Sequence, residues 1–288
     1  MPHPTAHDES SHRGDLVVAV VARRTPGAGG VEPFYTDLVL GMEDVLLPLD
    51  GAVLLRVIDD PAEETVDYRR WSRTREVAGV VVADFVEDDP RVALLSELEL
   101  PAILLGGDPS WPLPSVDVDN ARAVEDAVAF LVGLGHRRIG RVAGPGGLLH
   151  TIARSTAFDA AVARYGVTGE SIEGDYSVAS GADGTRALLA GFAPTAIIYD
   201  NALTATAGLE AAKADGLRVP HDLSLLAWDD SVLCQLSDPP LSVMQRDVRT
   251  VGAAAARGLV DAIRGERGTV VHAPSAVVVE RGTTAPPA

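Results

Sequence analysis

The chain has 288 residues, enough for one large domain or two of modest size. Hydrophobic residues make up 47% of it, which supports a packed core and excludes general disorder. The 24 Lys and Arg residues face 41 Asp and Glu residues, and the formal charge of −17 disfavours binding to nucleic acid or to an acidic membrane surface.

The first 15 residues are polar and predict a flexible tail in which His3 and His7 form no metal site. The tail lacks the apolar segment of a secretory signal, and no apolar run of the chain is long enough to span a bilayer. Cys234 is the single cysteine, which excludes an internal disulfide and fits a reducing compartment. These features predict a cytoplasmic protein without a membrane partner.

Short apolar, β-branched runs alternate with amphipathic segments from Leu16 onward. In the first part, strands are predicted at 16–22, 52–58, 79–84 and 101–106, and helices at 33–49, 62–75 and 89–98. In the second part, strands are predicted at 138–144, 194–200, 222–230 and 276–284, and helices at 121–135, 151–166, 182–192, 203–216 and 247–265. This alternation predicts an α/β protein with parallel sheets, arranged as two successive halves of domain size.

Polar residues stand where several of the predicted strands end. They are Arg23 and Arg24, Asp84, Asp200 and Asn201, and the adjacent carboxylates Asp229 and Asp230. Parallel sheets bind ligands at the carboxyl ends of their strands, so these residues predict a ligand site. The residues alone leave open whether the paired acids belong to a nucleotide site, a metal site, a catalytic dyad or a sugar clamp.

Familiar catalytic and cofactor motifs do not match. Gly27 and Gly29 follow a strand, but Glu32 stands at the third position of the dinucleotide fingerprint, and the chain has no Walker loop, G-x-S-x-G or H-E-x-x-H. The histidines fall singly, so no metal site and no cofactor are predicted. For His136 we expect a capping or surface role, and for Cys234 simple packing.

Several linked motifs resemble one family. They are "GLGHRRIGRVAGP", "ARSTAFDAAVARYGV" and "PTAIIYDNALTATAGLEAAKADGLRVPHDLSLLAWDDSVLCQLSDPPLSVMQRD", with "PFYTDLVLGMEDVL" and "SVDVDNARAVEDAVAFL" before them. In order and spacing they are similar to the lactose-repressor (LacI) and galactose-repressor family of bacterial transcription regulators, from about Leu16 to Thr284.

The resemblance implies a periplasmic-binding-protein-like fold with two Rossmann-like subdomains and a cleft between them. Three chain crossings are then expected, near Asp119, Asp247 and Thr269. The implied subdomains are 16–119 with 247–268, and 120–246 with 269–284, followed by a short tail at 285–288.

The resemblance also implies ligand-binding residues in the cleft. Asp229 matches the acid that holds ligand hydroxyls, whereas Asp230 is expected to brace a loop. Arg154, four residues beyond His150, matches an arginine that spans two ligand oxygens, and Asn201 matches an asparagine able to donate and accept. The full expected ligand set is Phe34, Asp84, His150, Arg154, Asn201, Trp228, Asp229 and Arg246.

Two positions depart from the family pattern. Ala202 stands where an acid usually follows the asparagine, so contacts of that acid are not expected. Arg246 replaces a neutral amide, and it either favours a ligand with phosphate or carboxylate or pairs with Asp229 or Asp247. Trp228 and Phe34 either stack on a sugar face or pack.

The function implied is that of an effector sensor of a transcription regulator, which binds a sugar or related polar molecule without chemical change. The implied partners are a second copy of the chain and DNA, the latter through a helix-turn-helix head that we expect this chain to lack, since only the polar tail precedes Leu16. The dimer is expected to use apolar faces at 39–49 and 92–98. The alternatives are a headless or exported sugar-binding protein and an α/β sugar-modifying enzyme.

Overall fold

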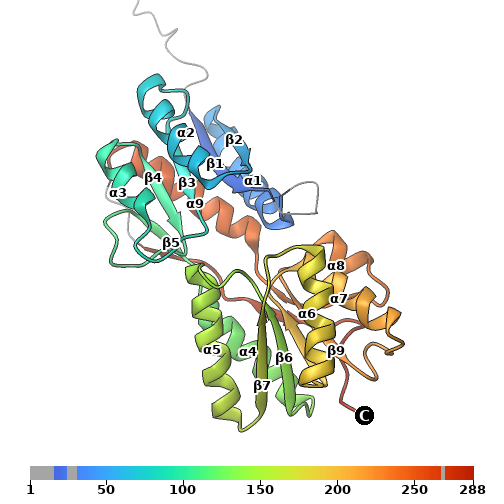
Figure 1. The fold of residues 1–288 in the computed structure, drawn as a ribbon. Coiled ribbons are helices and arrows are strands. Elements are labelled where there is room, and N and C mark those ends of the chain that lie inside the picture. Colours follow the sequence, from blue (N-terminus) through green and yellow to red (C-terminus); the bar gives the residue numbers. More distant parts are fainter. Residues whose placement is uncertain (1–15, 25–30, 267–269) are drawn as a thin grey trace, which may run out of the picture.

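The structure is a computed structural model that describes residues 16–24, 31–266 and 270–288. Its two sheets lie one above the other in Figure 1. The first sheet contains β1 (Val17–Arg23), β2 (Ala52–Ile58), β3 (Gly79–Val82), β4 (Ala102–Leu105), β5 (Ser115–Asp117) and β11 (Val271–His272). The second contains β6 (Arg138–Ala143), β7 (Thr168–Glu173), β8 (Ala196–Tyr199), β9 (Ser224–Trp228), β10 (Ser242–Gln245) and β12 (Val277–Val279).

Both sheets are dominated by parallel pairs. The first has the order β11-β5-β4-β3-β1-β2, and its pairs are parallel. The second has the order β12-β10-β9-β8-β6-β7, and within the described residues only β10 and β12 pair antiparallel. The predicted α/β class with two parallel sheets is therefore confirmed.

Helices cover both faces of each sheet. Around the first sheet lie α1 (Pro33–Leu46), the short 3-10 helix η1 (Leu47–Leu49), α2 (Pro61–Thr74), α3 (Pro90–Glu97) and α9 (Val248–Ile263). Around the second lie α4 (Asn120–Gly133), α5 (Leu149–Tyr165), α6 (Val178–Gly191), α7 (Ala202–Ala214) and α8 (Val232–Leu236).

Burial on both faces explains why the strands read as continuous apolar runs. In β1, Val18 and Val20 join the core formed with α1 and α9, whereas Ala19 and Val21 join the core formed with α2 and α3. The second sheet is covered in the same way by α4 and α5 on one face and by α6 and α7 on the other. A strand with no solvated face has no polar alternation.

Two glycines allow α1 and α9 to approach closely. A Cβ atom on Gly41 would lie 1.9 Å from the Arg249 carbonyl oxygen, and one on Gly252 would lie 2.1 Å from the Leu38 carbonyl oxygen. No larger side chain fits either position unless the backbone moves. The close contact holds α9, which follows the second sheet in sequence, against the first sheet (Figure 1).

The chain passes between the sheets three times. The first two passages lie between β5 and α4 and between β10 and α9, where Asp119 and Asp247 are the N-cap residues of the helices that follow. The third predicted crossing, near Thr269, lies outside the described residues. Because β11 pairs with β5, residues 271–272 lie in the first sheet and not in the second subdomain as predicted, and the chain reaches the second sheet only at β12.

Three expectations about single residues or segments can be compared with the structure. Cys234 is buried in the core between the second sheet and helices α6 and α7, as predicted. The capping or surface role expected for His136 is wrong, because its ring is fully buried between Thr195 Oγ1 at 2.9 Å and the Ala285 carbonyl oxygen at 3.0 Å. The apolar positions of 92–98 are not a free surface either: Val92, Leu94 and Leu95 pack into the first core.

Candidate functional site

A cleft opens where the carboxyl ends of the strands of both sheets face each other. Its walls come from the start of α1 and the loop after β3 in the first half, and from α5, β8, β9 and the loop after β10 in the second. The structure brings all eight predicted ligand residues to this one cleft: Phe34, Asp84, His150, Arg154, Asn201, Trp228, Asp229 and Arg246. Their contact with a ligand remains a prediction.

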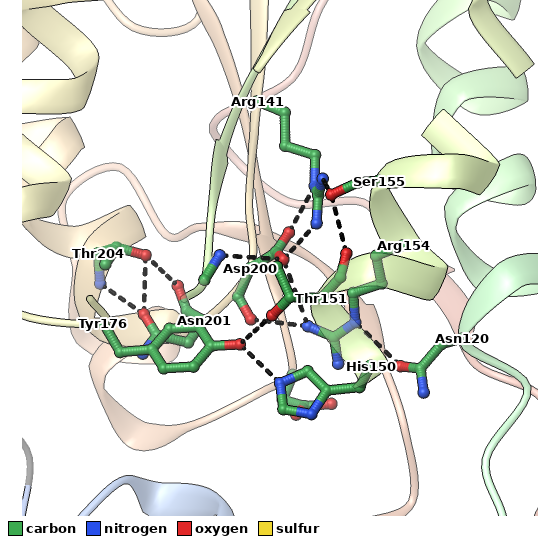
Figure 2. Close-up of polar contacts among 12 residues, drawn as sticks. Asn120, Arg141, His150, Thr151, Arg154, Ser155, Tyr176, Asp200, Asn201 and Thr204 are labelled. Carbon is green, nitrogen blue, oxygen red and sulfur yellow. Dashed lines mark hydrogen bonds and ion pairs between the residues drawn. The ribbon is translucent and has the colours of Figure 1, made fainter. Parts of the chain in front are cut away.

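Arg154 lies on α5 and is buried, and its guanidinium is held from three sides. Its Nε donates to Asn120 Oδ1 at 2.9 Å and its Nη1 to the Asp200 carbonyl oxygen at 3.2 Å. The guanidinium carbon lies 4.3 Å from the Trp228 ring centroid, within range of a cation–π contact. The two hydrogen bonds, which Figure 2 shows, and the ring contact together fix the orientation of the guanidinium plane.

Arg154 packs against a fully buried ion pair between Arg141 and Asp200. Arg141 Nε and Nη2 donate to the two Asp200 carboxylate oxygens at 2.8 and 2.5 Å, and Gly144 N donates to Oδ2 at 3.3 Å (Figure 2). Burial raises the pKa of Asp200, but the charges of Arg141 and Arg154 outweigh burial, and the net pKa lies below its usual range. Asp200 is therefore a charged support of the site that is not accessible to a ligand.

Asn201 follows β8 directly and is the N-cap residue of α7. Its Oδ1 accepts from Thr204 N at 2.8 Å and from Thr204 Oγ1 at 2.7 Å. Its Nδ2 donates across the cleft to Glu32 Oε1. The cap uses the carbonyl oxygen, so Asn201 presents a donor to the cleft and not the donor and acceptor together that we expected.

Glu32 is the N-cap residue of α1, yet its side chain makes no cap hydrogen bond. Burial, together with the Asp84 and Asp229 carboxylates, raises the pKa of this carboxyl to about 7 against the lowering effects of Asn201 and Arg154. Glu32 is therefore divided between its protonated and charged forms near neutral pH.

Asp84, His150 and Tyr176 form a second contact across the cleft. Tyr35 Oη donates to Asp84 Oδ2 at 2.6 Å, His150 Nδ1 lies 3.9 Å from Asp84 Oδ1, and His150 Nε2 lies 2.9 Å from Tyr176 Oη. Burial and the neighbouring Arg154 lower the pKa of His150 to about 4, so the imidazole is neutral at pH 7. Asp84 has φ 54°, in the left-handed region, which turns its side chain out of the strand direction.

The two adjacent acids after β9 have different partners. Asp229 has φ 59° and accepts from Arg246 Nε at 2.8 Å and Nη2 at 2.5 Å. Asp230 accepts from Arg281 Nη1 at 2.9 Å and Nη2 at 2.6 Å, and from Gln235 Nε2 at 3.1 Å. Asp230 thus braces the loop, as predicted. Of the two alternatives for Arg246, binding an anionic ligand or pairing with a neighbouring aspartate, the structure contains the pairing with Asp229.

The two predicted aromatic residues differ in exposure. Trp228 is 1% exposed, packs in the second core and has Arg154 over its ring, so it is a packing residue in this state. Phe34 is only partly buried at the mouth of the cleft, with Arg246 5.3 Å from its ring centroid and Tyr35 edge-on to it.

Sequence reasoning missed several lining residues, three of which make the hydrogen bonds described above. Glu32 entered only as the residue that broke a dinucleotide motif, and no local pattern shows that its carboxylate reaches Asn201. Tyr176 follows β7, an exposed polar edge strand without an apolar signature. Asn120 starts α4, where a polar residue is ordinary.

In the described ranges, no group of three or more His, Cys, Asp or Glu side chains is arranged to hold a metal ion.

Comparison with known proteins gives one consistent result. The family model described as "Periplasmic binding protein-like domain" matches residues 128–284. The HTH-type transcriptional regulator DegA of Bacillus subtilis (strain 168) is 30% identical over 243 residues, which cover 82% of this chain and 72% of DegA. The HTH-type transcriptional regulator CelR of Thermobifida fusca is 29% identical over 274 residues, 92% of this chain and 80% of CelR.

Solved structures agree with the sequence relatives. A LacI family transcriptional regulator from Bifidobacterium animalis subsp. lactis DSM 10140 superimposes with a TM-score of 0.85 at 31% identity, covering 95% of this chain and 99% of that one. The CelR–cellobiose complex superimposes with a TM-score of 0.83 at 27% identity, covering 93% and 84%. The two-subdomain architecture expected from the sequence motifs is therefore shared with solved regulators.

Proposed function

Because this chain belongs to the LacI family of transcriptional regulators, we propose that it is the effector-sensing part of such a regulator and that its cleft binds a sugar or a related polyhydroxylated molecule. The observation that carries this proposal is the position of polar side chains from both halves on one cleft. Arg154, Asn201 and Asp229 face it from the second half, and Glu32 and Asp84 face it from the first.

Each residue has a role that follows from its geometry. Arg154 offers a fixed, planar set of N–H donors to two ligand oxygens. Asp229 keeps free lone pairs beside its two bonds to Arg246, and these accept from ligand hydroxyls. His150 and Tyr176 offer polar atoms to ligand hydroxyls, and the partly exposed ring of Phe34 offers an apolar face. The relative CelR is known in complex with cellobiose, which supports this ligand class.

Ligand binding then favours the closed arrangement of the two halves. A molecule that contacts both walls binds the closed form more tightly than the open form, and the difference in affinity shifts the equilibrium toward closure. A coupling of about 1–3 kcal/mol is typical of such transitions and changes DNA occupancy several-fold. We propose that DNA is contacted by a helix-turn-helix head. We also propose that the protein is cytoplasmic.

A homodimer through the first half is part of the proposal. Leu40, Leu47 and Leu49, at α1 and η1, remain 41%, 62% and 43% exposed although they are large and apolar. This patch stands in place of the broader surface expected from the sequence.

No helix among the described residues could cross a membrane.

A ligand screen tests the proposed function. We expect cellobiose or another neutral sugar to raise the melting temperature of the purified chain and to be recovered unchanged by mass spectrometry after prolonged incubation. Turnover of the bound sugar would support a sugar-modifying enzyme instead. Absence of any thermal shift across neutral, anionic and amino sugars at millimolar concentration would reject a sugar effector.

A further inference from the structure

The charged side chains of the cleft bear on which ligands it accepts. We propose that Glu32 is a specificity-determining residue that selects ligands donating a hydrogen bond to its carboxylate beside Asn201, from a hydroxyl or an ammonium group, and that it rejects ligands carrying a carboxylate or phosphate there. This inference rests on the proposed function and specifies the ligand class of the same site.

The Glu32 side chain is available to a ligand because its own helix does not use it. It stands at the N-cap of α1, where a carboxylate commonly accepts from the first backbone N–H groups, but it makes no such bond. Instead it extends over the cleft to the Asn201 side chain. No other hydrogen bond to the Glu32 carboxylate occurs within the described residues, so lone pairs on both of its oxygens remain for a ligand.

Asn201 defines the other side of this point. Its carbonyl oxygen accepts from both donors of Thr204, so the orientation of the amide is fixed and Nδ2 faces Glu32. A ligand group that approaches this contact meets the Nδ2 donor of Asn201 and the acceptor oxygens of Glu32. A hydroxyl matches both, since it donates to Glu32 and accepts from Asn201, whereas an ionised carboxylate or phosphate only accepts and would face a second carboxylate.

Arg246 does not offset this repulsion because it is already paired with Asp229, and Arg154 keeps only the N–H groups that its two bonds leave over. Arg246 donates twice to Asp229, with side-chain exposures of 10% and 18%. Arg154 donates to Asn120 Oδ1 and to the Asp200 carbonyl oxygen, and its face covers Trp228. To pair with Arg246, an anionic group would have to displace Asp229 and leave that partly buried carboxylate without its partner.

Further acids strengthen the same preference. Asp84 and Asp37 line the cleft on the side of the first half. Burial raises the pKa of Asp37, and the neighbouring Asp229 and Asp230 carboxylates raise it as well. The wall opposite Arg154 is therefore acidic, and a neutral or positively charged ligand fits it best.

Calorimetric titration with matched sugars tests the inference. The probes are glucose, galactose and mannose, each as the neutral sugar, the 2-amino sugar and the uronic acid, together with cellobiose beside cellobionic acid. For whichever set binds, we expect the parent chain at pH 8, where Glu32 is mostly charged, to prefer the neutral or amino form over the acid by about tenfold or more.

Glu32→Gln keeps the shape and hydrogen-bonding capacity of the side chain and removes its charge. We expect it to melt no lower than the parent and to reduce the preference over the acid by about tenfold. Asp37→Asn is the control for overall negative charge, because it removes a carboxylate that also lines the cleft but is not hydrogen-bonded to Asn201, and it should reduce the preference less than Glu32→Gln does.

Three results would overturn the inference. An acid form that binds the parent chain as tightly as its neutral partner would contradict it while leaving the proposed function intact. An equal change of preference in Asp37→Asn and Glu32→Gln would assign the effect to overall charge and not to Glu32. If no probe of any class binds, the proposed function fails and the inference fails with it.

Discussion

Three aspartates near the cleft each accept two hydrogen bonds from one arginine, but they differ in depth. The Arg141–Asp200 side chains are 0% and 1% exposed, the Arg246–Asp229 side chains 10% and 18%, and the Arg281–Asp230 side chains 20% and 11%. Since the chemistry of the three pairs is the same, their different burial predicts different losses of stability when the carboxylate is removed.

Asp200→Ala should be the most damaging of the three substitutions. It leaves the Arg141 guanidinium buried with Ser155 Oγ as its remaining hydrogen-bond partner, and it removes the acceptor of Gly144 N. Loss of one partner of a buried ion pair costs about 3–5 kcal/mol of unfolding free energy. For the two shallower pairs solvent screens the remaining arginine, so Asp229→Ala and Asp230→Ala should each cost about 1 kcal/mol.

Urea unfolding followed by circular dichroism measures these differences. Asp222→Ala is the control, because its pair with Arg218 lies on the surface; although Asp222 also accepts from Arg218 N, its loss should lower the free energy of unfolding far less than Asp200→Ala does. Ligand affinity should follow a different order, with Asp229→Ala losing binding and Asp230→Ala retaining it. Equal destabilisation by Asp200→Ala and Asp222→Ala would refute the argument that burial determines the cost.

Three further substitutions or conditions test other parts of the structure. The pKa of Glu32 is about 7 against 4.5 for an ordinary glutamate, so its contribution to the stability of the folded state is fully present below pH 4.5 and is lost as the pH rises through 7. The melting temperature of the parent relative to Glu32→Gln should therefore fall between about pH 5 and pH 8. Arg154→Lys should weaken effector binding at least about tenfold in calorimetry, since an ammonium cannot replace the planar fork, and unchanged affinity would contradict that role. Gly252→Ala should destabilise by about 2 kcal/mol or more because its Cβ would meet the Leu38 carbonyl, whereas Gly133→Ala, with no atom within 4 Å, should be neutral or stabilising in urea unfolding.

Sequence patterns predicted the central strands and most helices because these elements bury apolar side chains at regular spacing. The signal fails where a strand is exposed or very short: β7 is a polar edge strand, β5 has three residues, and β11 has two exposed ones, so none of them has a periodic pattern. The assignment of residues 271–272 to the second half failed for this reason, since only the pairing of β11 with β5 places them.

The site could be predicted in part. Strand-end residues such as Asp84, Asn201 and Asp229 lie at the cleft because parallel strands share one carboxyl edge. The pairing of Arg246 with Asp229 and the contact of Glu32 with Asn201 depend on how the two halves meet, which no local spacing encodes. His136 shows the same limit: its buried position depends on Ala285, which is remote in sequence.

The central claim is that this cleft binds a small polar effector through groups fixed at the strand ends. A calorimetric titration of the parent chain and of Asp229→Ala with the same sugar tests it most directly. We predict saturable binding of one ligand per chain by the parent and an affinity about ten- to a hundred-fold lower in Asp229→Ala, which corresponds to the loss of a charged hydrogen bond of about 1.5–3 kcal/mol. Equal affinity of the two proteins, with both folded, would contradict the claim.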